Sequence, residues 1–170
     1  MAEIDPNLIK FFQCTTWTEG DSHGGPPSTN QITSGQMENV FDHVQPDEKP
    51  SVEYRKIFIK NENPGTWPDI VAWISVLTGW DEDEFDINVD QATWDDVQTD
   101  AVAYTYYRPT SRDHVDTKKL RVYNSSGELQ NTDGDLGQNE YAPIWIRRTV
   151  NTTTEGYTNN SGIITLGTQY

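Results

Sequence analysis

The sequence predicts an all-β fold, an antiparallel β-sandwich of jelly-roll or immunoglobulin-like type with an extended N-terminal arm. Residues 52–61 and 142–150 alternate side chains with the period of two that marks a β-strand. Many short strands, separated by turn residues about every ten positions, are typical of sandwiches. The hydrophobic content is 34%, but six Trp and eight Tyr supply large buried areas. Together these features favour a thin, aromatic-rich core.

The first thirty residues are predicted to form the arm, and residues 31–170 the sandwich domain. Residues 8–14 suit a short strand or a turn of helix. Residues 17–30 contain two glycines followed by two prolines, a combination that cannot hold a regular helix or a central strand. In an assembly protein such an arm would reach an adjacent subunit, and a frayed terminus fits equally well.

The next elements are strands separated by turns. Residues 32–44 suggest a strand, a turn and a short strand, and the polar residues 45–50 lead into the strong strand at 52–61. The Pro-Gly pair within residues 61–66 predicts a type II turn. Residues 70–77 are apolar, β-branched and aromatic, which predicts a central strand between two layers.

The second half continues the same pattern. Alternation begins again at Phe85, residues 92–98 suit one helical turn, and residues 101–107 predict another strand. A shorter strand at 117–123 and a glycine-rich loop at 131–137 lead to the strand around Ile144, and residues 162–167 predict a closing strand.

Composition excludes several classes of function. A formal net charge of -15 argues against binding to nucleic acids or anionic membranes, because both require clustered Lys and Arg. A single cysteine, Cys14, excludes an intrachain disulfide and a cysteine-based zinc site, and we expect it to be a small packed residue. No apolar run reaches the length of a membrane span, and no signal peptide is visible, so the sequence predicts a soluble chain that is not secreted.

Acidic side chains concentrate between residues 81 and 96. Such oxygen ligands suit Ca²⁺, but the run lacks the Asp-x-Asp-x-Asp-Gly pattern of a calcium loop, and a solvated acidic surface is the favoured interpretation. The loop at 131–137 is a second weak candidate. We therefore predict no cofactor, with Ca²⁺ as the one alternative. Its candidate ligands are Asp81, Asp83, Asp86, Asp133 and Asp135.

Catalytic patterns are not found. His23, His43 and His114 lie far apart and show no metal-ligand spacing. No serine has the Gly-x-Ser-x-Gly pattern, and no glycine-rich nucleotide motif follows a strand. Carboxylates are abundant, but abundance is not a glycosidase acid pair. The sequence predicts no catalytic residues.

Aromatic and basic residues give candidates for a contact surface. Trp67 and Trp80 lie at predicted strand ends, where they could serve as interface anchors or as a sugar-stacking platform, whereas Trp145 lies in an apolar strand and is expected in the core. Basic side chains on the two alternating strands are expected to pair with carboxylates inside the sandwich or on a neighbour, or simply to face solvent. These basic interface candidates are Lys56, Lys60, Arg147 and Arg148.

Several motifs, taken in order, resemble a family of small β-sandwich structural proteins from the virions of tailed bacteriophages. They begin with His-Gly-Gly at residues 23–25, Ile-Thr-Ser-Gly at 32–35 and Val-Phe-Asp-His-Val at 40–44. They continue with Glu-Tyr-Arg-Lys-Ile-Phe-Ile-Lys-Asn, Val-Ala-Trp-Ile-Ser and Pro-Ile-Trp-Ile-Arg-Arg-Thr-Val, and close with Gly-Ile-Ile-Thr-Leu-Gly-Thr, at residues 53–61, 71–75, 143–150 and 162–168. Where the family continues with Pro-Ala-Gly, this chain has Asn-Thr-Thr-Thr, which leaves the contact role of that loop open.

The resemblance implies a non-enzymatic component of the virion. We expect a capsid decoration or cement protein that stabilises the shell, partnered by the major capsid protein and forming a homo-oligomer such as a trimer. A tail or baseplate component is the alternative within the virion class. A carbohydrate-binding sandwich that uses Trp67, Trp80 and nearby tyrosines, with or without Ca²⁺, is the alternative from another class, and an acid-rich glycoside hydrolase ranks below it.

Overall fold

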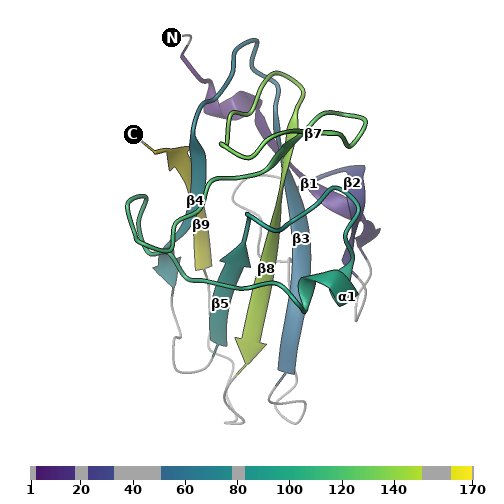
Figure 1. The fold of residues 1–170 in the computed structure, drawn as a ribbon, viewed down its shortest axis with the longest axis vertical. Coiled ribbons are helices and arrows are strands. Elements are labelled where there is room, and N and C mark those ends of the chain that lie inside the picture. The colour runs from purple at the N-terminus through teal and green to yellow at the C-terminus, as the bar shows by residue number, and fades with distance from the viewer. Residues whose placement is uncertain (1–2, 18–22, 33–50, 78–82, 151–161, 170) are drawn as a thin grey trace.

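The computed structural model describes residues 3–17, 23–32, 51–77, 83–150 and 162–169. In these residues the regular secondary structure is almost entirely antiparallel β-sheet, which confirms the predicted fold class (Figure 1). The strands are β1 (Ile9–Trp17), β2 (His23–Ile32), β3 (Ser51–Asn61), β4 (Ile70–Leu77), β5 (Asp83–Asn88), β6 (Val122–Tyr123), β7 (Leu129–Asn131), β8 (Tyr141–Val150) and β9 (Gly162–Thr168). A 3-10 turn, η1 (Pro6–Leu8), and a short helix, α1 (Gln98–Ala101), complete the described elements. Neither helix is long enough to cross a membrane.

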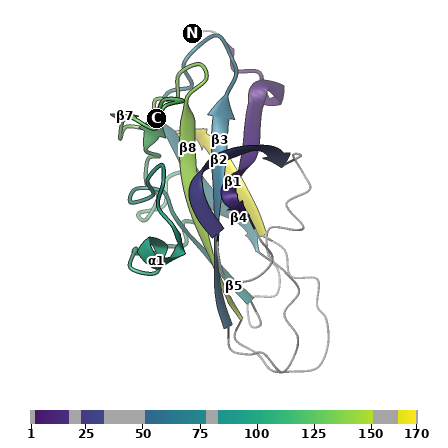
Figure 2. The same cartoon turned by 90° about the vertical axis from the view of Figure 1, so that its right-hand side faces the viewer.

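The main sheet has β3 and β8 at its centre. Its order is β2-β1-β3-β8-β6-β7, and β5 also pairs with β8. The β3–β8 ladder runs from the Ser51–Val150 pair to the Lys60–Tyr141 pair, so the two strongest predicted strands are each other's neighbours. A second sheet pairs β4 with β9 and lies across one face of the main sheet, which curls around it (Figures 1 and 2).

The main hydrophobic core lies between these two sheets. Its buried members include Ile57 and Ile59 from β3, Ile144 and Ile146 from β8, and Ile70 from β4. Because side chains in a strand alternate between faces, Lys56, Phe58 and Trp145 must point to the opposite face of the main sheet. We call that side the Lys56 face.

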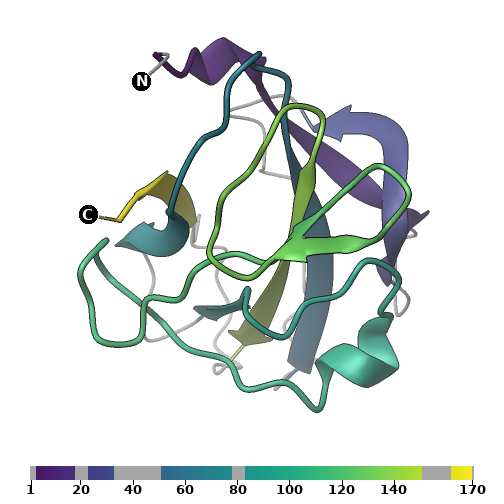
Figure 3. The ribbon, with the colours of Figure 1, turned by 45° about the horizontal axis from the view of Figure 1, so that its top comes forward.

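A non-strand segment covers the Lys56 face. Residues 89–107, which include α1 and which we call the covering segment, cross in front of β3 and β8 on the side away from β4 and β9 (Figures 2 and 3). Ala92 and Ala101 from this segment pack with Trp145 in a second buried cluster. The middle parts of β3 and β8 are consequently buried on both faces, although alternation of apolar and polar residues is typical of a strand buried on one face.

The described parts of the predicted arm, residues 3–17 and 23–30, do not stand apart from the domain. β1 pairs with β3 and β2 pairs with β1, so most of this region belongs to the main sheet. The Gly-Gly-Pro-Pro run lies in β2, which is an edge strand, the position where a residue without an N–H group is tolerated. Cys14 is buried in β1, as expected, and burial raises the pKa of its thiol.

Four further predictions need correction. Residues 70–77 do form β4, but it belongs to the two-stranded sheet and not to the centre of the main one. Residues 101–107 are not a strand, since they leave α1 and pass over the Lys56 face, and only Tyr107 forms a β-bridge, with Ile87. The strand predicted at 117–123 shortens to β6, and the helical turn predicted at 92–98 is replaced by α1, which begins at Gln98. The prediction for 33–44 lies outside the described residues.

Candidate functional site

The Lys56 face contains a cluster of buried polar groups around Lys56 and Asp96. Lys56 is fully buried in the middle of β3, with its Nζ atom 4.7 Å from the centre of the Phe58 ring and 5.8 Å from that of Trp145. Its Nζ donates to the backbone oxygens of Gly25 at 2.9 Å and of Trp94 at 3.0 Å. Charged lysines are rarely buried unless they are paired, so this position requires a counter-ion.

Asp96 in the covering segment supplies that counter-ion. One carboxylate oxygen, Oδ1, lies 2.5 Å from Nζ of Lys56, and the Asp96 side chain is 3% exposed. The other oxygen, Oδ2, accepts three hydrogen bonds: from the Thr93 amide at 2.8 Å, the Tyr104 hydroxyl at 2.8 Å and Nε1 of Trp145 at 2.9 Å. Asp96 thereby ties the covering segment to both central strands.

The β2 edge strand completes the enclosure. The Gly25 amide donates to the backbone oxygen of Asp96 at 2.8 Å. A Cβ atom at Gly24 would lie 2.7 Å from the Cα of Val97, closer than real Cβ contacts allow. The glycine pair of the sequence is therefore needed because β2 passes directly against the covering segment.

The interface candidate Lys56 is consequently inside the protein. The prediction that it lies on a contact surface is wrong for the described structure, because its ammonium group has internal acceptors and no exposed area. The sequence also allowed Lys56 to pair with a carboxylate inside the fold, and the structure shows this pairing, with Asp96. Burial lowers the pKa of Lys56, and the charge of Asp96 opposes this shift.

The other three basic candidates lie nearer the ends of the two central strands, β3 and β8. Arg147 contacts Asp86 at 3.0 Å and lies over the ring of Tyr106, 4.7 Å from its centre. Arg148 is 3.5 Å from Glu53 across the β3–β8 ladder. Lys60 pairs with Glu62 at 3.1 Å and lies near the ring of Tyr141. All three are partly exposed, so they remain candidates for outside contacts.

The calcium candidates whose side chains the structure describes, Asp86, Asp133 and Asp135, form no common metal site. Asp86 is buried between two guanidinium groups, with Arg108 and Arg147 each 3.0 Å away, so its carboxylate already has two positive partners. Asp133 and Asp135 are exposed in a loop whose amides donate to Asn131. Within the described residues no group of three or more His, Cys, Asp or Glu side chains could hold a metal ion. Asp81 and the side chain of Asp83 lie outside what the structure describes.

Trp67 does not form an exposed stacking platform. It packs against the main core, and its Nε1 donates to Oγ1 of Thr168 at 3.0 Å. Its backbone forms a bridge with Leu136, which fixes the residue at the end of the β4–β9 sheet. Trp80, the other predicted anchor, lies outside the described residues.

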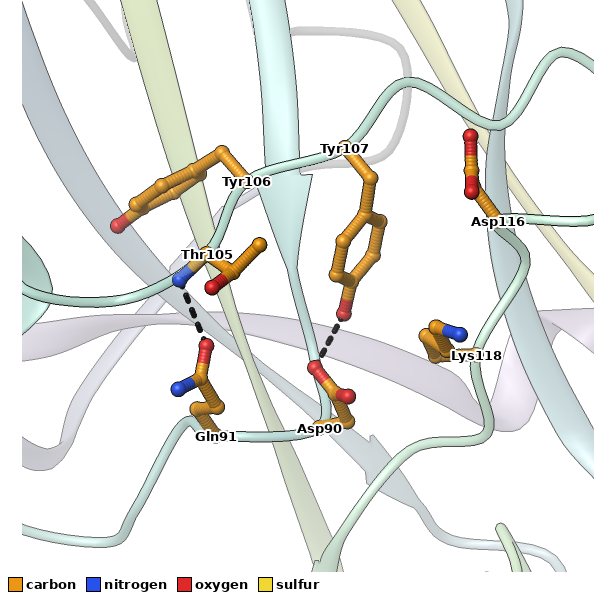
Figure 4. A pocket seen from close by; sticks show the side chains of 7 residues that line it. All are labelled: Asp90, Gln91, Thr105, Tyr106, Tyr107, Asp116 and Lys118. Atoms are coloured by element: carbon orange, nitrogen blue, oxygen red, sulfur yellow. Dashed lines mark hydrogen bonds between the residues drawn. The ribbon is translucent and has the colours of Figure 1, made fainter.

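An open hollow lies beside the covering segment, with a volume of about 590 Å³ (Figure 4). The Tyr107 hydroxyl donates to Asp90 at 2.5 Å, and the Thr105 amide donates to the Gln91 side chain at 2.7 Å. These groups are therefore hydrogen-bonded to one another along the wall of the hollow. Its lining residues are Asp90, Gln91, Thr105, Tyr106, Tyr107, Asp116 and Lys118.

Asp96 is the residue that the sequence interpretation missed. It appeared there only as one more acid at the end of an acidic run. The available signal was Lys56 itself, placed between Tyr54 and Phe58 on one strand face, because a lysine among aromatic residues needs a buried acid. Which of the twenty-seven acids would fill that place depends on the path of the covering segment, and spacing does not reveal it.

Comparisons with protein-family models, curated proteins and solved structures find no match to this chain.

Three partly buried tyrosines of the covering segment predict a loss of stability in alkaline solution. Burial is the main cause that raises the pKa values of Tyr104, Tyr106 and Tyr107 above their ordinary value of 10.0, with Asp96 and Asp90 adding to the shift of Tyr104 and Tyr107 respectively. A raised pKa in the folded state contributes stability below pH 10 that is lost as the pH rises further, because the unfolded chain ionises first.

We therefore expect the urea midpoint of unfolding to be lower at about pH 11 than at about pH 9. Tyr107→Phe should make this fall smaller, because one of the shifted groups has been removed. An unchanged midpoint across this range would show that the phenols are not neutral, buried groups.

Proposed function

We propose that this chain is a non-enzymatic structural protein of a tailed-bacteriophage virion and that it serves as a capsid decoration subunit. The observation that carries the proposal is the position of the two longest family-like motifs. Residues 53–61 and 143–150 are β3 and β8, the paired central strands of the main sheet. These motifs therefore lie in the central strands of the sheet and not in a loop.

Three buried ionisable groups are paired within the fold, which supports a structural role. Lys56, Asp86 and Asp96 are each engaged by oppositely charged partners within the fold. A catalytic carboxylate or lysine must instead reach a substrate in a cleft. The internal pairs hold the covering segment on the sheet, which suits a protein whose task is to keep its shape on a particle.

Three partly exposed basic residues supply positive charge on the proposed contact surface. Lys60, Arg147 and Arg148 lie on strands of an otherwise acidic protein with net charge -15. We propose that they contribute to contacts with the major capsid protein or with other copies of the chain. A specific contact of this kind buries about 1,000 Å² or more, and a closed trimer would reuse one patch three times.

The hollow beside Tyr107 favours one alternative, a carbohydrate-binding sandwich. Tyrosine, carboxylate and amide groups are typical of polar sugar sites, and Lys118 and Asp116 lie at its rim. Because Tyr107 and Gln91 already hydrogen-bond to neighbouring groups, we rank this function second.

Immunogold electron microscopy of intact particles, with antibody raised against the purified chain, tests the proposal. We expect regular labelling over the capsid shell. Labelling confined to the tail would overturn the decoration role and support a tail or baseplate component. Absence of the chain from purified particles, together with glycan binding that Tyr106→Ala abolishes, would support the carbohydrate-binding alternative instead.

A further inference from the structure

The two oxygens of the buried Asp96 carboxylate have unlike surroundings. Oδ2 accepts three hydrogen bonds, from Thr93, Tyr104 and Trp145. Oδ1 is buried without an aligned hydrogen bond, although Nζ of Lys56 lies only 2.5 Å away. Three donors on one oxygen form the arrangement that stabilises the oxyanion of an acyl-transfer intermediate. The other oxygen faces a nitrogen nucleophile and is the one placed to leave.

The nitrogen is held in place by the backbone. The oxygens of Gly25 and Trp94 accept from Nζ at 2.9 and 3.0 Å, and the backbone oxygen of Asp96 lies 3.4 Å from it. The side chains of Lys56 and Asp96 are 0% and 3% exposed, so bulk water does not compete at the site. Fixing two reacting groups in this way gives effective concentrations of about 10⁵ M or more in favourable cases.

We propose that Lys56 and Asp96 condense to form an intramolecular isopeptide bond between β3 and the covering segment. A proton first passes from the ammonium to the carboxylate, and the resulting amine attacks Cγ of Asp96. The developing oxyanion on Oδ2 is stabilised by its three donors. The C–Oδ1 bond then breaks, and Oδ1 leaves as water with two protons that came from the ammonium. One N–H remains on the amide, and no oxidant or further reactant is needed.

The product would keep the three hydrogen bonds of the carboxylate oxygen and one of those that Nζ donates. The amide N–H can donate to the Gly25 oxygen, and the amide oxygen keeps the three donors now on Oδ2. Two buried charges, which are costly in a dry interior, are replaced by one neutral amide. Burial also lowers the pKa of Lys56, which raises the share of the amine form that attacks. The inference rests on this cluster and is independent of the proposed virion role.

Intact-mass spectrometry of the purified full chain under denaturing conditions tests the proposal. We expect most molecules to be lighter than the sequence mass by one water molecule. Trypsin cleaves neither after an acylated lysine nor between Arg108 and Pro109, so digestion should yield a branched peptide that joins residues 56–60 to residues 61–112. Mapping is essential because dehydration of Asp133, which precedes a glycine, removes the same mass.

Two variants make the assignment specific. Lys56→Arg keeps the positive charge but has no amine nucleophile, and it should show the full sequence mass. Asp96→Asn should release ammonia instead of water and give the same final mass as the unmodified sequence does after condensation. Full sequence mass in the natural chain, without a branched peptide, would overturn the proposal and leave an ordinary buried ion pair. Equal water loss in Lys56→Arg would overturn it as well.

Discussion

Replacing Asp96 by alanine is expected to lower the free energy of unfolding by about 3 to 5 kcal/mol. The substitution removes the charge that faces the fully buried Lys56, and it leaves the Trp145 indole N–H and the Tyr104 hydroxyl without their acceptor. A buried charge without a partner is among the most destabilising changes that one substitution can produce. Urea unfolding followed by tryptophan fluorescence measures the effect.

The adjacent acid provides a matched control for this experiment. Asp95 lies on the same loop but is exposed, so Asp95→Ala should change stability by no more than about 0.5 kcal/mol. Similar losses in the two variants would show that general charge, not the internal pair, governs stability. A small loss in Asp96→Ala alone would contradict the described role of the cluster.

Truncating Trp145 to alanine is expected to cost about 3 to 5 kcal/mol. The side chain is fully buried on β8, packs with Ala92 and Ala101 of the covering segment, and donates to Asp96. Alanine would leave a large cavity between the central strands and their cover, and would remove one anchor of the carboxylate.

Two comparisons define the expected result for Trp145. Trp145→Phe keeps most of the packing but loses the indole N–H, so its loss should be smaller than that of Trp145→Ala. Val115→Ala, at a position 85% exposed, should leave the urea midpoint nearly unchanged. If Trp145→Ala shifts the urea midpoint no more than Val115→Ala does, packing of the covering segment on the sheet does not depend on the Trp145 side chain.

The strands that the sequence predicts well are those whose own pattern determines them. β3 and β8 alternate strongly, and β9 is a short apolar run between polar segments. The same local reasoning fails for residues 101–107, where Tyr, Thr and Val favour a strand but the chain forms the end of α1 and an extended cover. Packing of Tyr104 and Tyr106 onto the Trp145 cluster outweighs that preference.

The site was less accessible to prediction than the fold. Alternation correctly places Lys56 and Phe58 on one face of the sheet. That face is buried only because the covering segment packs on it, and alternation does not predict this. The Lys56–Asp96 pair joins residues forty positions apart, with no spacing rule to link them. Likewise, the glycine pair of β2 suggested a breaker, whereas its role is close approach to the segment at Asp96 and Val97.

Hydrogen exchange of the covering segment tests the central claim most directly, namely that residues 89–107 are held firmly against the Lys56 face. The amides of Thr93, Thr105 and Tyr107 have internal acceptors, so we expect them to exchange nearly as slowly as the central amides of β3 and β8. Exchange of these amides at the rate of an exposed loop, while β3 and β8 stay protected, would contradict the account.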